Sequence, residues 1–254
     1  MSSAPAVRAV AIIPARLASE RFPRKVLADS TGKPMVVHVA EAASKASTIE
    51  RVVVACDSQE IVDAVTPHGF ECLLTDPAHP NGTARVAEAA RTLDISEDFA
   101  IVNVQGDEPE IEPSTIDAAA EALFDRGTPV ATIGVPFGED EDPTNPNIVK
   151  LVCNVQREAM YFSRAPIPFG RDSTPAYYKH VGLYAYRRSF LEIVTTLAPT
   201  RLEQAEKLEQ LRFLEHGYAI AVARAESSMP GIDTPEQYEA FVDRYRRRAD
   251  SAQV

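Results

Sequence analysis

The chain has 254 residues, 26 Lys and Arg against 37 Asp and Glu, and a formal net charge of −11. Its 45% of hydrophobic residues is typical of one folded globular protein with a sizeable core. The acidic balance argues against general nucleic-acid binding, because neutralising phosphates needs a basic surface, although one local basic pocket remains compatible with it.

No segment of the sequence has the pattern of a membrane anchor or a signal peptide. The most apolar stretch, residues 7–15, has about half of the ~20 residues that a membrane span needs, and the opening MSSAP lacks a charged start and an apolar run. The three cysteines are odd in number and follow no metal-ligand spacing, so we interpret them as reduced, mostly buried thiols. We therefore expect a cytoplasmic protein with no membrane insertion.

Short β-branched runs alternate with amphipathic stretches in the first part of the chain. We predict strands at residues 8–13, where Pro14 ends the strand, and at 51–55, 71–74, 99–105 and 130–135. The predicted helices lie between them, at residues 34–45, 58–66, 81–93 and 113–124. This alternation is typical of an α/β fold with a mostly parallel sheet and helices on both faces.

The pattern changes after about Gly138. Predicted strands at residues 148–152, 159–162 and 180–186 have no helix between them, and prolines are frequent in this region. We expect a small antiparallel excursion at about residues 139–187, inside a single domain that covers residues 1–254. Such an excursion often forms a dimer contact or covers a site. The remaining predicted elements are helices at 188–196 and 202–216, a strand at 218–222 and a helix at 235–248.

The first segment with candidate chemistry follows the first predicted strand and reads IIPARLASERFPRK. Its charges sum to +3, from Arg16, Arg21, Arg24 and Lys25 against Glu20, in a chain that totals −11. Open α/β sheets bind ligands at the carboxyl ends of their strands, and a cationic loop there suits a polyphosphate. A solvated basic loop is the alternative. The sequence has neither a P-loop nor Gly-x-Gly-x-x-Gly after a strand, which disfavours P-loop ATPases and classical dinucleotide dehydrogenases.

Two carboxylates are candidate metal ligands. The segment NVQGDEP delivers Gln105 and then Asp107 through a glycine turn, again at the carboxyl edge of the sheet. A carboxylate there suits Mg²⁺, which takes one or two carboxylates plus substrate phosphates, whereas a turn aspartate bonded to its own backbone is the alternative. Asp233, in GIDTPEQ, offers a second carboxylate, for which an ordinary helix N-cap is the alternative.

Five further polar residues are candidates for a binding site. They are Arg85 in NGTAR, Arg164 in FSRA, His180 in KHVG, and Glu209 and Gln210 in LEQL. Each of them alone also fits a surface ion pair, a cap or a satisfied polar residue. We assign no role to the other histidines, at positions 38, 68, 79 and 216.

Taken together, these segments resemble the CMP-Kdo synthetases (3-deoxy-manno-octulosonate cytidylyltransferases). The resemblance runs from about residue 11 to residue 241. Its motifs in this chain are IIPARLASERFPRK, GKPMVVHV, NGTARVAE, NVQGDEP, NPNIVK, YFSRAPIP, HVGLYAY, LEQAEKLEQLR and GIDTPEQ, and their order and spacing are far more specific than any single one.

The resemblance implies a Rossmann-like, GT-A-like nucleotidyltransferase fold, a homodimer, and a Mg²⁺-dependent reaction for lipopolysaccharide synthesis. In that reaction CTP and 3-deoxy-D-manno-octulosonate (Kdo) give CMP-Kdo and diphosphate. By matching position it implies Arg16, Ser19, Arg21 and Lys25 as CTP-binding residues. It implies Asp107 and Asp233 as Mg²⁺ ligands, and assigns catalysis to them together with Arg16 and Lys25. It places six residues around the sugar acid, namely Arg85, Gln105, Arg164, His180, Glu209 and Gln210.

The chain departs from the family pattern at two places. The family reads Ser-Gly-Thr-Glu-Arg where this chain has NGTAR, so the carboxylate before Arg85 is replaced by Ala84. The segment before Asp233 is also shorter than the family's Pro-Gly-Thr-Gly-Val-Asp. Two alternatives follow: a cytidylyltransferase for a different sugar acid, such as a modified Kdo or sialic acid, and a catalytically silent nucleotide-binding homologue.

Overall fold

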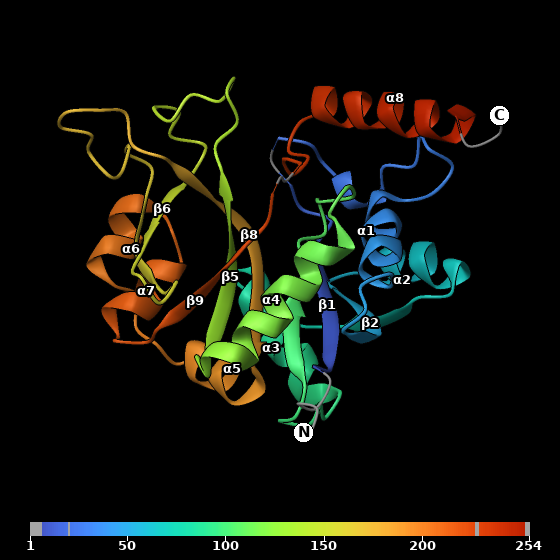
Figure 1. Ribbon diagram of the computed structural model, residues 1–254. Coiled ribbons are helices and arrows are strands. Elements are labelled where there is room, and N and C mark those ends of the chain that lie inside the picture. The colour runs from blue at the N-terminus through green and yellow to red at the C-terminus, as the bar shows by residue number, and fades with distance from the viewer. Residues whose placement is uncertain (1–6, 20, 227–228, 252–254) are drawn as a thin grey trace, which may run out of the picture.

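Apolar strands form the centre of the molecule, which the computed structural model describes over residues 7–19, 21–226 and 229–251 (Figure 1). Seven strands lie in the order β3-β2-β1-β4-β8-β5-β9, and β6 and β7 pair beside β8. Their bounds are β1 (Ala9–Ala15), β2 (Ile49–Cys56), β3 (Glu71–Leu74), β4 (Ala100–Asn103), β5 (Val130–Pro136), β6 (Lys150–Cys153), β7 (Ala159–Ser163), β8 (Tyr178–Arg187) and β9 (Ile220–Arg224).

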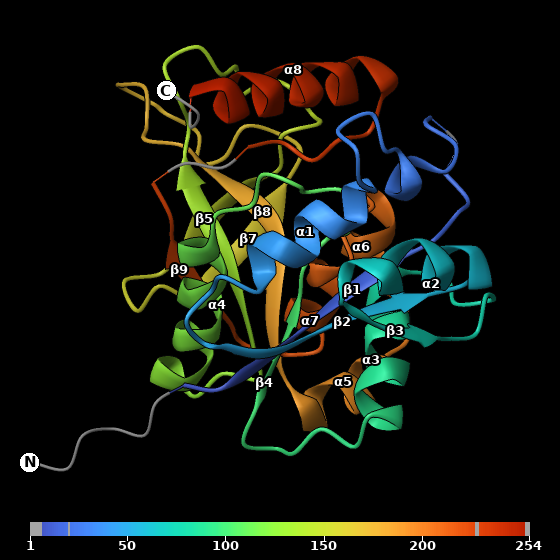
Figure 2. The same ribbon diagram turned by 90° about the vertical axis from the view of Figure 1, so that its right-hand side faces the viewer.

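Helices cover both faces of this sheet (Figures 1 and 2). On one face lie α1 (Met35–Ala43), α2 (Gln59–Val65) and α4 (Pro113–Arg126). On the other face lie α3 (Gly82–Thr92), α5 (Arg188–Val194) and α7 (Gln210–Glu215), with α6 (Arg201–Glu206) beside α7. The long helix α8 (Pro235–Ser251) lies across the top in both views.

Strand direction agrees with the predicted fold class. β1 runs parallel to its neighbours β2 and β4, β2 runs parallel to β3, and β5 runs parallel to β9. β8 is antiparallel to both β4 and β5, and the hairpin of β6 and β7 is also antiparallel. The prediction of an α/β fold with a largely parallel central sheet is thus confirmed, with antiparallel strands after the point where the sequence pattern changes.

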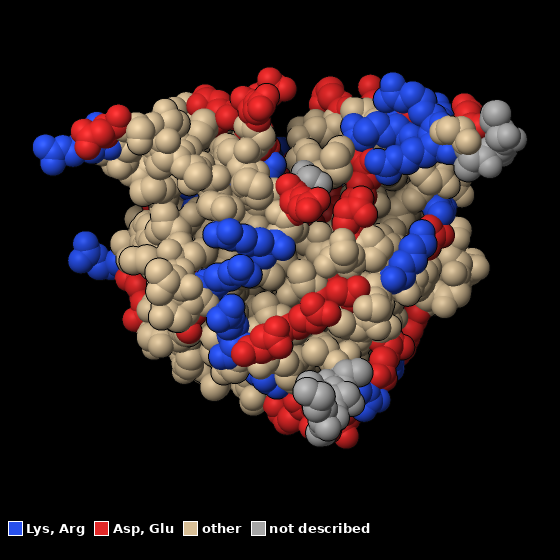
Figure 3. Space-filling view, viewed as in Figure 1, with Lys and Arg blue, Asp and Glu red and all other residues tan. Residues whose placement is uncertain are grey.

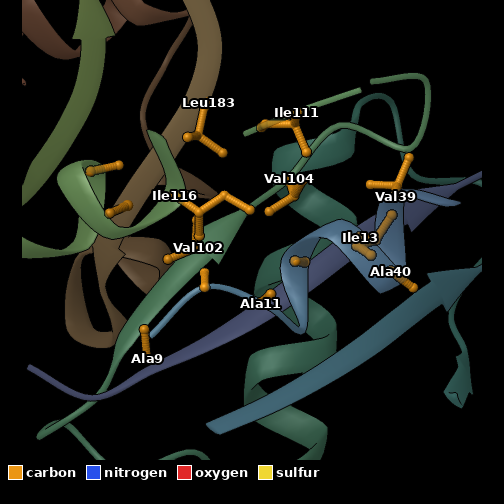
Figure 4. Packing of buried hydrophobic residues seen from close by; sticks show 14 of the residues in the cluster. Ala9, Ala11, Ile13, Val39, Ala40, Val102, Val104, Ile111, Ile116 and Leu183 are labelled. Carbon is orange, nitrogen blue, oxygen red and sulfur yellow. The ribbon is translucent and has the colours of Figure 1, made fainter. Parts of the chain in front are cut away.

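Alternation along β1 supplies the core of both faces, because successive side chains of a strand point to opposite sides. Ala11 and Ile13 point to one face, where they pack with Val102 of β4, Ile116 of α4 and Val39 of α1 (Figure 4). The intervening residues of β1 belong to the second cluster, which includes side chains of α3, α5 and α7. Both faces of the parallel strands are therefore buried, as their uninterrupted apolar sequences predict.

Several predicted boundaries are wrong, including the ends of two strands and the extent of one predicted helix. β1 continues through Pro14, which pairs with Ala55 of β2 and lies beyond the last residue that pairs with β4, so the missing N–H of the proline breaks no bond to β4. The strand predicted at residues 99–105 ends at Asn103, which leaves Gln105 in a loop. The helix predicted at residues 202–216 is two helices, because Lys207 adopts a left-handed conformation with φ of 54° between α6 and α7.

Basic side chains form one cluster on α8. Figure 3 shows Lys and Arg side chains over the C-terminal half of α8, at the upper right. Arg244 and Arg248 of this helix bind Glu110 at 2.5 and 3.3 Å, which ties α8 to the loop after β4. None of the helices in the described parts of the chain is long and apolar enough to cross a membrane.

Two smaller expectations concern cysteines and the basic loop. The three cysteines are free thiols, but only Cys56 is fully buried, while Cys72 is half-buried and Cys153 is exposed. Glu20, which we counted in the charge of the basic loop, lies outside the described residues.

Candidate active site

A cavity of about 790 Å³ lies at the carboxyl end of β1. It is lined by the loop after β1, by the first turn of α3, by the loop after β4 and by Asp233 before α8. The structure therefore brings together segments from both ends of the chain. Of the residues singled out from the sequence, the lining includes Arg16, Ser19, Arg21, Lys25, Arg85, Gln105, Asp107 and Asp233.

Lys25 lies at the centre of the charged part of this cavity. Its Nζ donates to Oδ2 of Asp107 at 2.6 Å, to Oδ1 of Asp233 at 3.0 Å and to the carbonyl oxygen of Ile232 at 3.0 Å. The Lys25 side chain is only 13% exposed, so these contacts hold the ammonium at one point. Two carboxylates from distant segments thus converge on a single cation.

Close backbone approaches place Asp107 beside the end of β1. A Cβ atom on Gly106 would lie 2.9 Å from the carbonyl oxygen of Pro14, so only glycine allows the turn to pass this close to β1. The backbone N–H of Ile232 donates to the carbonyl oxygen of Asp107 at 2.8 Å. This bond fixes the segment that carries Asp233 next to the Asp107 turn.

The cations of the basic loop have different partners. Arg21 binds Oδ2 of Asp233 at 2.8 Å and lines the cavity. Arg24 forms an ion pair with Glu60 at the N-terminus of α2 and does not line the cavity. Arg16 is exposed at the cavity and pairs with no carboxylate among the described residues. We counted these cations together in the sequence analysis, whereas in the structure the Arg24 side chain lies away from the cavity.

Arg85 is a buried cation in the cavity wall. It is 3% exposed, donates to Oγ1 of Thr75, and has no carboxylate within ion-pair distance in the described part of the chain. Thr75 in turn donates to the carbonyl oxygen of Cys56 at 2.8 Å, which fixes the hydroxyl. A buried guanidinium needs compensation, so this environment suits an anionic ligand group.

A second cavity of about 490 Å³ adjoins the first, and His79 and Asn81 line both. Glu209 lines the second cavity, where its two oxygens accept hydrogen bonds from Asn81 Nδ2 and Thr83 Oγ1, both at 2.8 Å. Burial raises the pKa of Glu209, and the hydrogen bond from Thr83 opposes that rise. Ala84 also lines this cavity.

His180 and Gln210 lie outside the lining of both cavities. His180 is enclosed between Phe162 and Tyr184, with ring centroids 5.0 and 5.4 Å away, and burial lowers its pKa to about 3. The imidazole is therefore neutral. Gln210 is 4% exposed, and its Nε2 has no hydrogen-bond partner among the described residues.

Arg164 also lies outside both linings, and backbone carbonyls hold its guanidinium. Nε donates to Glu206 at 2.7 Å and Nη1 to Pro146 at 2.9 Å. The carbonyl oxygen of Arg164 accepts a hydrogen bond from Lys150, a fully buried lysine whose pKa is lowered by burial. Arg164 is thus rigidly held at the end of β7.

Strand β8 contains a bulge that Gln105 contacts. Thr132 of β5 pairs with Tyr184 and the next residue pairs with Val181, so Gly182 and its neighbour are unpaired there. Gln105 reaches across from the first cavity and donates to the carbonyl oxygen of Gly182 at 3.0 Å. Bulges of this kind are frequent beside active sites because they redirect side chains.

The sequence reasoning missed two titratable residues, one that lines the site and one that lies next to Asp107. His79 lines both cavities, and its Nε2 contacts a carboxylate oxygen of Glu88 on α3. Glu108 follows Asp107, and burial, together with the nearby Asp107 carboxylate, raises the pKa of Glu108 to about 8. Their positions at the carboxyl ends of β3 and β4 were the available signal, because ligands bind at that edge of an open sheet.

The donor set fits a divalent cation that also binds substrate phosphates. No group of three or more His, Cys, Asp or Glu side chains that suits a metal occurs in the described residues. The two converging carboxylates, Asp107 and Asp233, match the one or two protein carboxylates that Mg²⁺ typically takes, with phosphate and water oxygens completing its shell. The ammonium of Lys25 lies between them, which shows that both oxygens face one cationic position.

Comparison with known proteins shows similarity over most of the chain. A family model described as cytidylyltransferase matches residues 10–222. The chain is 50% identical over 240 residues to a 3-deoxy-manno-octulosonate cytidylyltransferase of Syntrophobacter fumaroxidans, covering 93% of this chain and 96% of that protein. It is 51% identical over 234 residues to the protein of the same name from Polynucleobacter necessarius, covering 90% and 92% of the two chains.

A solved structure shows the same fold. It is a CMP:2-keto-3-deoxy-manno-octonic acid synthetase complexed with CTP, and it superposes with a TM-score of 0.90 at 37% sequence identity. The alignment covers 95% of this chain and 99% of the other.

Proposed function

The chain belongs to the 3-deoxy-manno-octulosonate cytidylyltransferase family, and from this premise we propose that it transfers the cytidylyl group of CTP to Kdo, giving CMP-Kdo and diphosphate. The observation that carries the proposal is the convergence of Asp107 and Asp233 on Lys25 within a cavity at the carboxyl edge of the sheet. Carboxylates and cations in one cavity suit a metal-dependent reaction of a nucleoside triphosphate.

Arg16, Ser19, Arg21 and Lys25 are the proposed CTP-binding residues. All four lie in one short stretch that lines the cavity, so a triphosphate would meet them together. In the structure Arg21 and Lys25 bind carboxylates, and phosphate oxygens are equivalent acceptors for both. These two residues can therefore transfer their hydrogen bonds from the carboxylates to the triphosphate when CTP enters.

Mg²⁺ is the proposed metal, held by Asp107 and Asp233. When bound, it would neutralise phosphate charge and favour departure of diphosphate. The protein contributes positioning: the Gly106 turn and the Ile232 backbone bond fix both carboxylates before substrates arrive. Fixed charges of this kind stabilise the transition state without reorganisation during the reaction.

The anomeric hydroxyl of the sugar acid attacks the α-phosphorus of CTP, and both reactants are anions. Arg85 is the proposed partner for the carboxylate of Kdo, because its buried guanidinium lacks a carboxylate among the described residues. Gln105, beside Gly182, and the carboxylate of Glu209 are proposed partners for hydroxyl groups. Offsetting the repulsion between the two anions and aligning them for in-line attack is the main task of these residues.

The remaining sugar-acid residues are Arg164, His180 and Gln210, which lie outside the cavity linings. They remain proposed ligands of the sugar acid. The Nε2 group of buried Gln210 has no hydrogen-bond partner in the described part of the chain, and the neutral His180 lies two positions from Gly182 on β8. Arg164 has donors beyond the two bonded to carbonyl groups.

Oligomer, location and pathway complete the proposal. The three most exposed large apolar side chains in the described parts of the chain are Val155, Met160 and Phe169, at 93, 63 and 88% exposure. All three lie in the predicted excursion at residues 139–187, and we propose that this part of a single 1–254 domain contacts a second copy of the chain. A cytoplasmic location and a role in lipopolysaccharide synthesis follow from the family and are proposed with it.

Diphosphate release tests the proposed function directly. Purified protein is incubated with Mg²⁺, each of the four nucleoside triphosphates, and Kdo or sialic acid. Release with CTP and Kdo alone is the expected result. Release with CTP and only another sugar acid would support the same chemistry with a different substrate. This alternative is specific, because Ala84 lines the second cavity at the position where the resemblance leads us to expect a glutamate. Absence of release with every pair would refute the proposal.

A further inference from the structure

Asn81 connects two parts of the site through one side chain. Its Oδ1 accepts a hydrogen bond from the backbone N–H of Ala84 at 2.9 Å and caps α3, while its Nδ2 donates to Oε1 of Glu209 at 2.8 Å. The oxygen has to face the N–H and the nitrogen has to face the carboxylate, so the two bonds together determine the orientation of the amide. A serine at this position caps a helix equally well but has no second group that reaches Glu209.

Glu209 depends on these contacts for its side-chain orientation. Its backbone is fixed, because Leu208 and Leu211 on either side are buried in the core. Asn81 and Thr83 each donate to one carboxylate oxygen, at 2.8 Å. A carboxylate has about four acceptor directions, so about two remain for a ligand. Losing the Asn81 bond would free the carboxylate to rotate and would leave one oxygen without a donor.

The two cavities meet at Asn81. Arg85 lines the first cavity and Glu209 the second, and Asn81 and His79 line both. A sugar acid that contacts Arg85 and Glu209 at the same time therefore passes beside Asn81. We propose that Asn81 is a positioning residue for Kdo, holding the Glu209 carboxylate toward the sugar hydroxyl groups at this boundary. The inference rests on the proposed function and adds to it a residue with no assigned role.

Two substitutions separate the cap from the contact with Glu209. Asn81→Ser keeps a helix cap and removes the amide donor, whereas Asn81→Asp keeps the cap and the shape but places a second carboxylate against Glu209. We expect KM for Kdo to rise about ten-fold in Asn81→Asp and less in Asn81→Ser, the scale of losing one partner of a buried polar group. KM for CTP and the thermal unfolding midpoint are expected to stay close to wild type in both variants.

Asn154 provides a matched control. Its Oδ1 accepts from the backbone N–H of Glu158 and its Nδ2 donates to the Glu158 carboxylate, both at 2.9 Å, in the turn between β6 and β7. Asn154→Asp thus makes the same chemical change in the same kind of contact away from both cavities. It is expected to leave KM for Kdo unchanged.

A double substitution tests whether Asn81 acts through Glu209. In a Glu209→Gln background the new amide can donate to Asp at position 81, so adding Asn81→Asp should cause no further rise in KM for Kdo. An equal ten-fold rise in both backgrounds would overturn the inference, as would a rise in KM for CTP equal to that for Kdo. Unchanged KM for Kdo in Asn81→Asp and Asn81→Ser would also overturn it. The wild-type protein distinguishes failure of the inference about Asn81 from failure of the proposed function. If the wild type releases no diphosphate with CTP and Kdo, the proposed function itself is refuted.

Discussion

The Lys25 ammonium lies 2.6 Å from Oδ2 of Asp107, although the two residues are 82 positions apart in the chain. The contact joins the loop after β1 to the loop after β4, and these strands are direct neighbours in the sheet. Because parallel neighbours end at the same edge, a cationic loop and an acidic turn become two sides of one cavity.

Asp107→Asn is expected to lower turnover at least ~10²-fold with little loss of stability, because one preorganised electrostatic contact contributes on that scale. The Asp107 side chain is 29% exposed, so the neutral amide can be accommodated. Diphosphate release and thermal unfolding, measured on the same preparation, give the two quantities. Turnover near that of the wild type would contradict the metal-ligand assignment.

Asp117→Asn is the matched control for that substitution. Asp117, on α4, accepts four hydrogen bonds from the backbone and hydroxyl groups of Ser47 and Thr48, at 2.7 to 3.0 Å, and is absent from the cavity lining. We expect a loss of about 1 kcal/mol in the free energy of unfolding and unchanged turnover. Asp107→Asn should therefore lower activity with little change in stability, whereas Asp117→Asn should lower stability with no change in activity.

Lys25→Ala is expected to raise KM for CTP about ten-fold or more, the scale of losing a charge-assisted contact to phosphate. Arg24→Ala removes a cation only one position away, but its guanidinium pairs with Glu60 and does not line the cavity. Arg24→Ala should therefore leave KM for CTP within a few-fold of wild type. Equal effects of both substitutions would show that the loop acts only through its total charge.

Acid should destabilise the fold through His38. This histidine is 6% exposed on α1, with Phe241 and Tyr245 of α8 at centroid distances of 5.2 and 4.8 Å. Burial, with a smaller effect of Lys33, lowers the pKa of His38 to about 4. The unfolded chain binds the proton more readily, so the stability from neutral His38 is present above about pH 6.5 and is lost as the pH falls toward 4.

The expected loss is about 2 kcal/mol between pH 7 and pH 5. Urea unfolding at both values, for the wild type and for His38→Gln, isolates this contribution, since other titrating groups are shared. His68→Gln changes an exposed histidine and serves as the control. The same pH dependence in wild type and His38→Gln would show that His38 does not cause it.

The oligomeric state tests the proposed role of the excursion. If residues 139–187 contact a second copy, Met160→Glu places a charge in an apolar interface and should shift the protein toward monomer in sedimentation at micromolar concentration. Leu74→Glu changes another exposed apolar side chain, on the edge strand β3, and should have no effect. A wild-type protein that is monomeric at high concentration would refute the dimer.

Strand and helix positions followed from local patterns, and so did the edge of the sheet that carries the site. Apolar runs of β1, β2 and β4 predicted parallel strands, and the loops after β1 and β4 were both predicted at the carboxyl edge of the sheet. Elements whose boundaries depend on a single residue were less predictable. Lys207 breaks a stretch that is helical by periodicity, because it adopts the left-handed conformation that residues other than glycine rarely adopt.

The sequence could not predict which carboxylate each arginine of the basic loop binds. Arg21 and Arg24 are chemically alike and three positions apart, yet one binds Asp233 and the other binds Glu60. The difference arises from the backbone of the loop, where Arg24 has φ of 60° and turns its side chain toward α2. His79 was missed for a related reason, since its contact with Glu88 depends on how the loop before α3 folds back onto that helix.

The bond from Ile232 to the Asp107 turn has a consequence for the order in which the site is assembled. Strands β1 and β4 can pair as soon as the first part of the chain is available, and domains generally begin to fold from the N-terminal side during synthesis. The second carboxylate, Asp233, arrives only after β9, so a growing chain carries the cationic loop and Asp107 without their last partner while about half of its residues are added. Metal and triphosphate affinity are therefore expected to appear together, late, when the segment before α8 docks and completes the cavity.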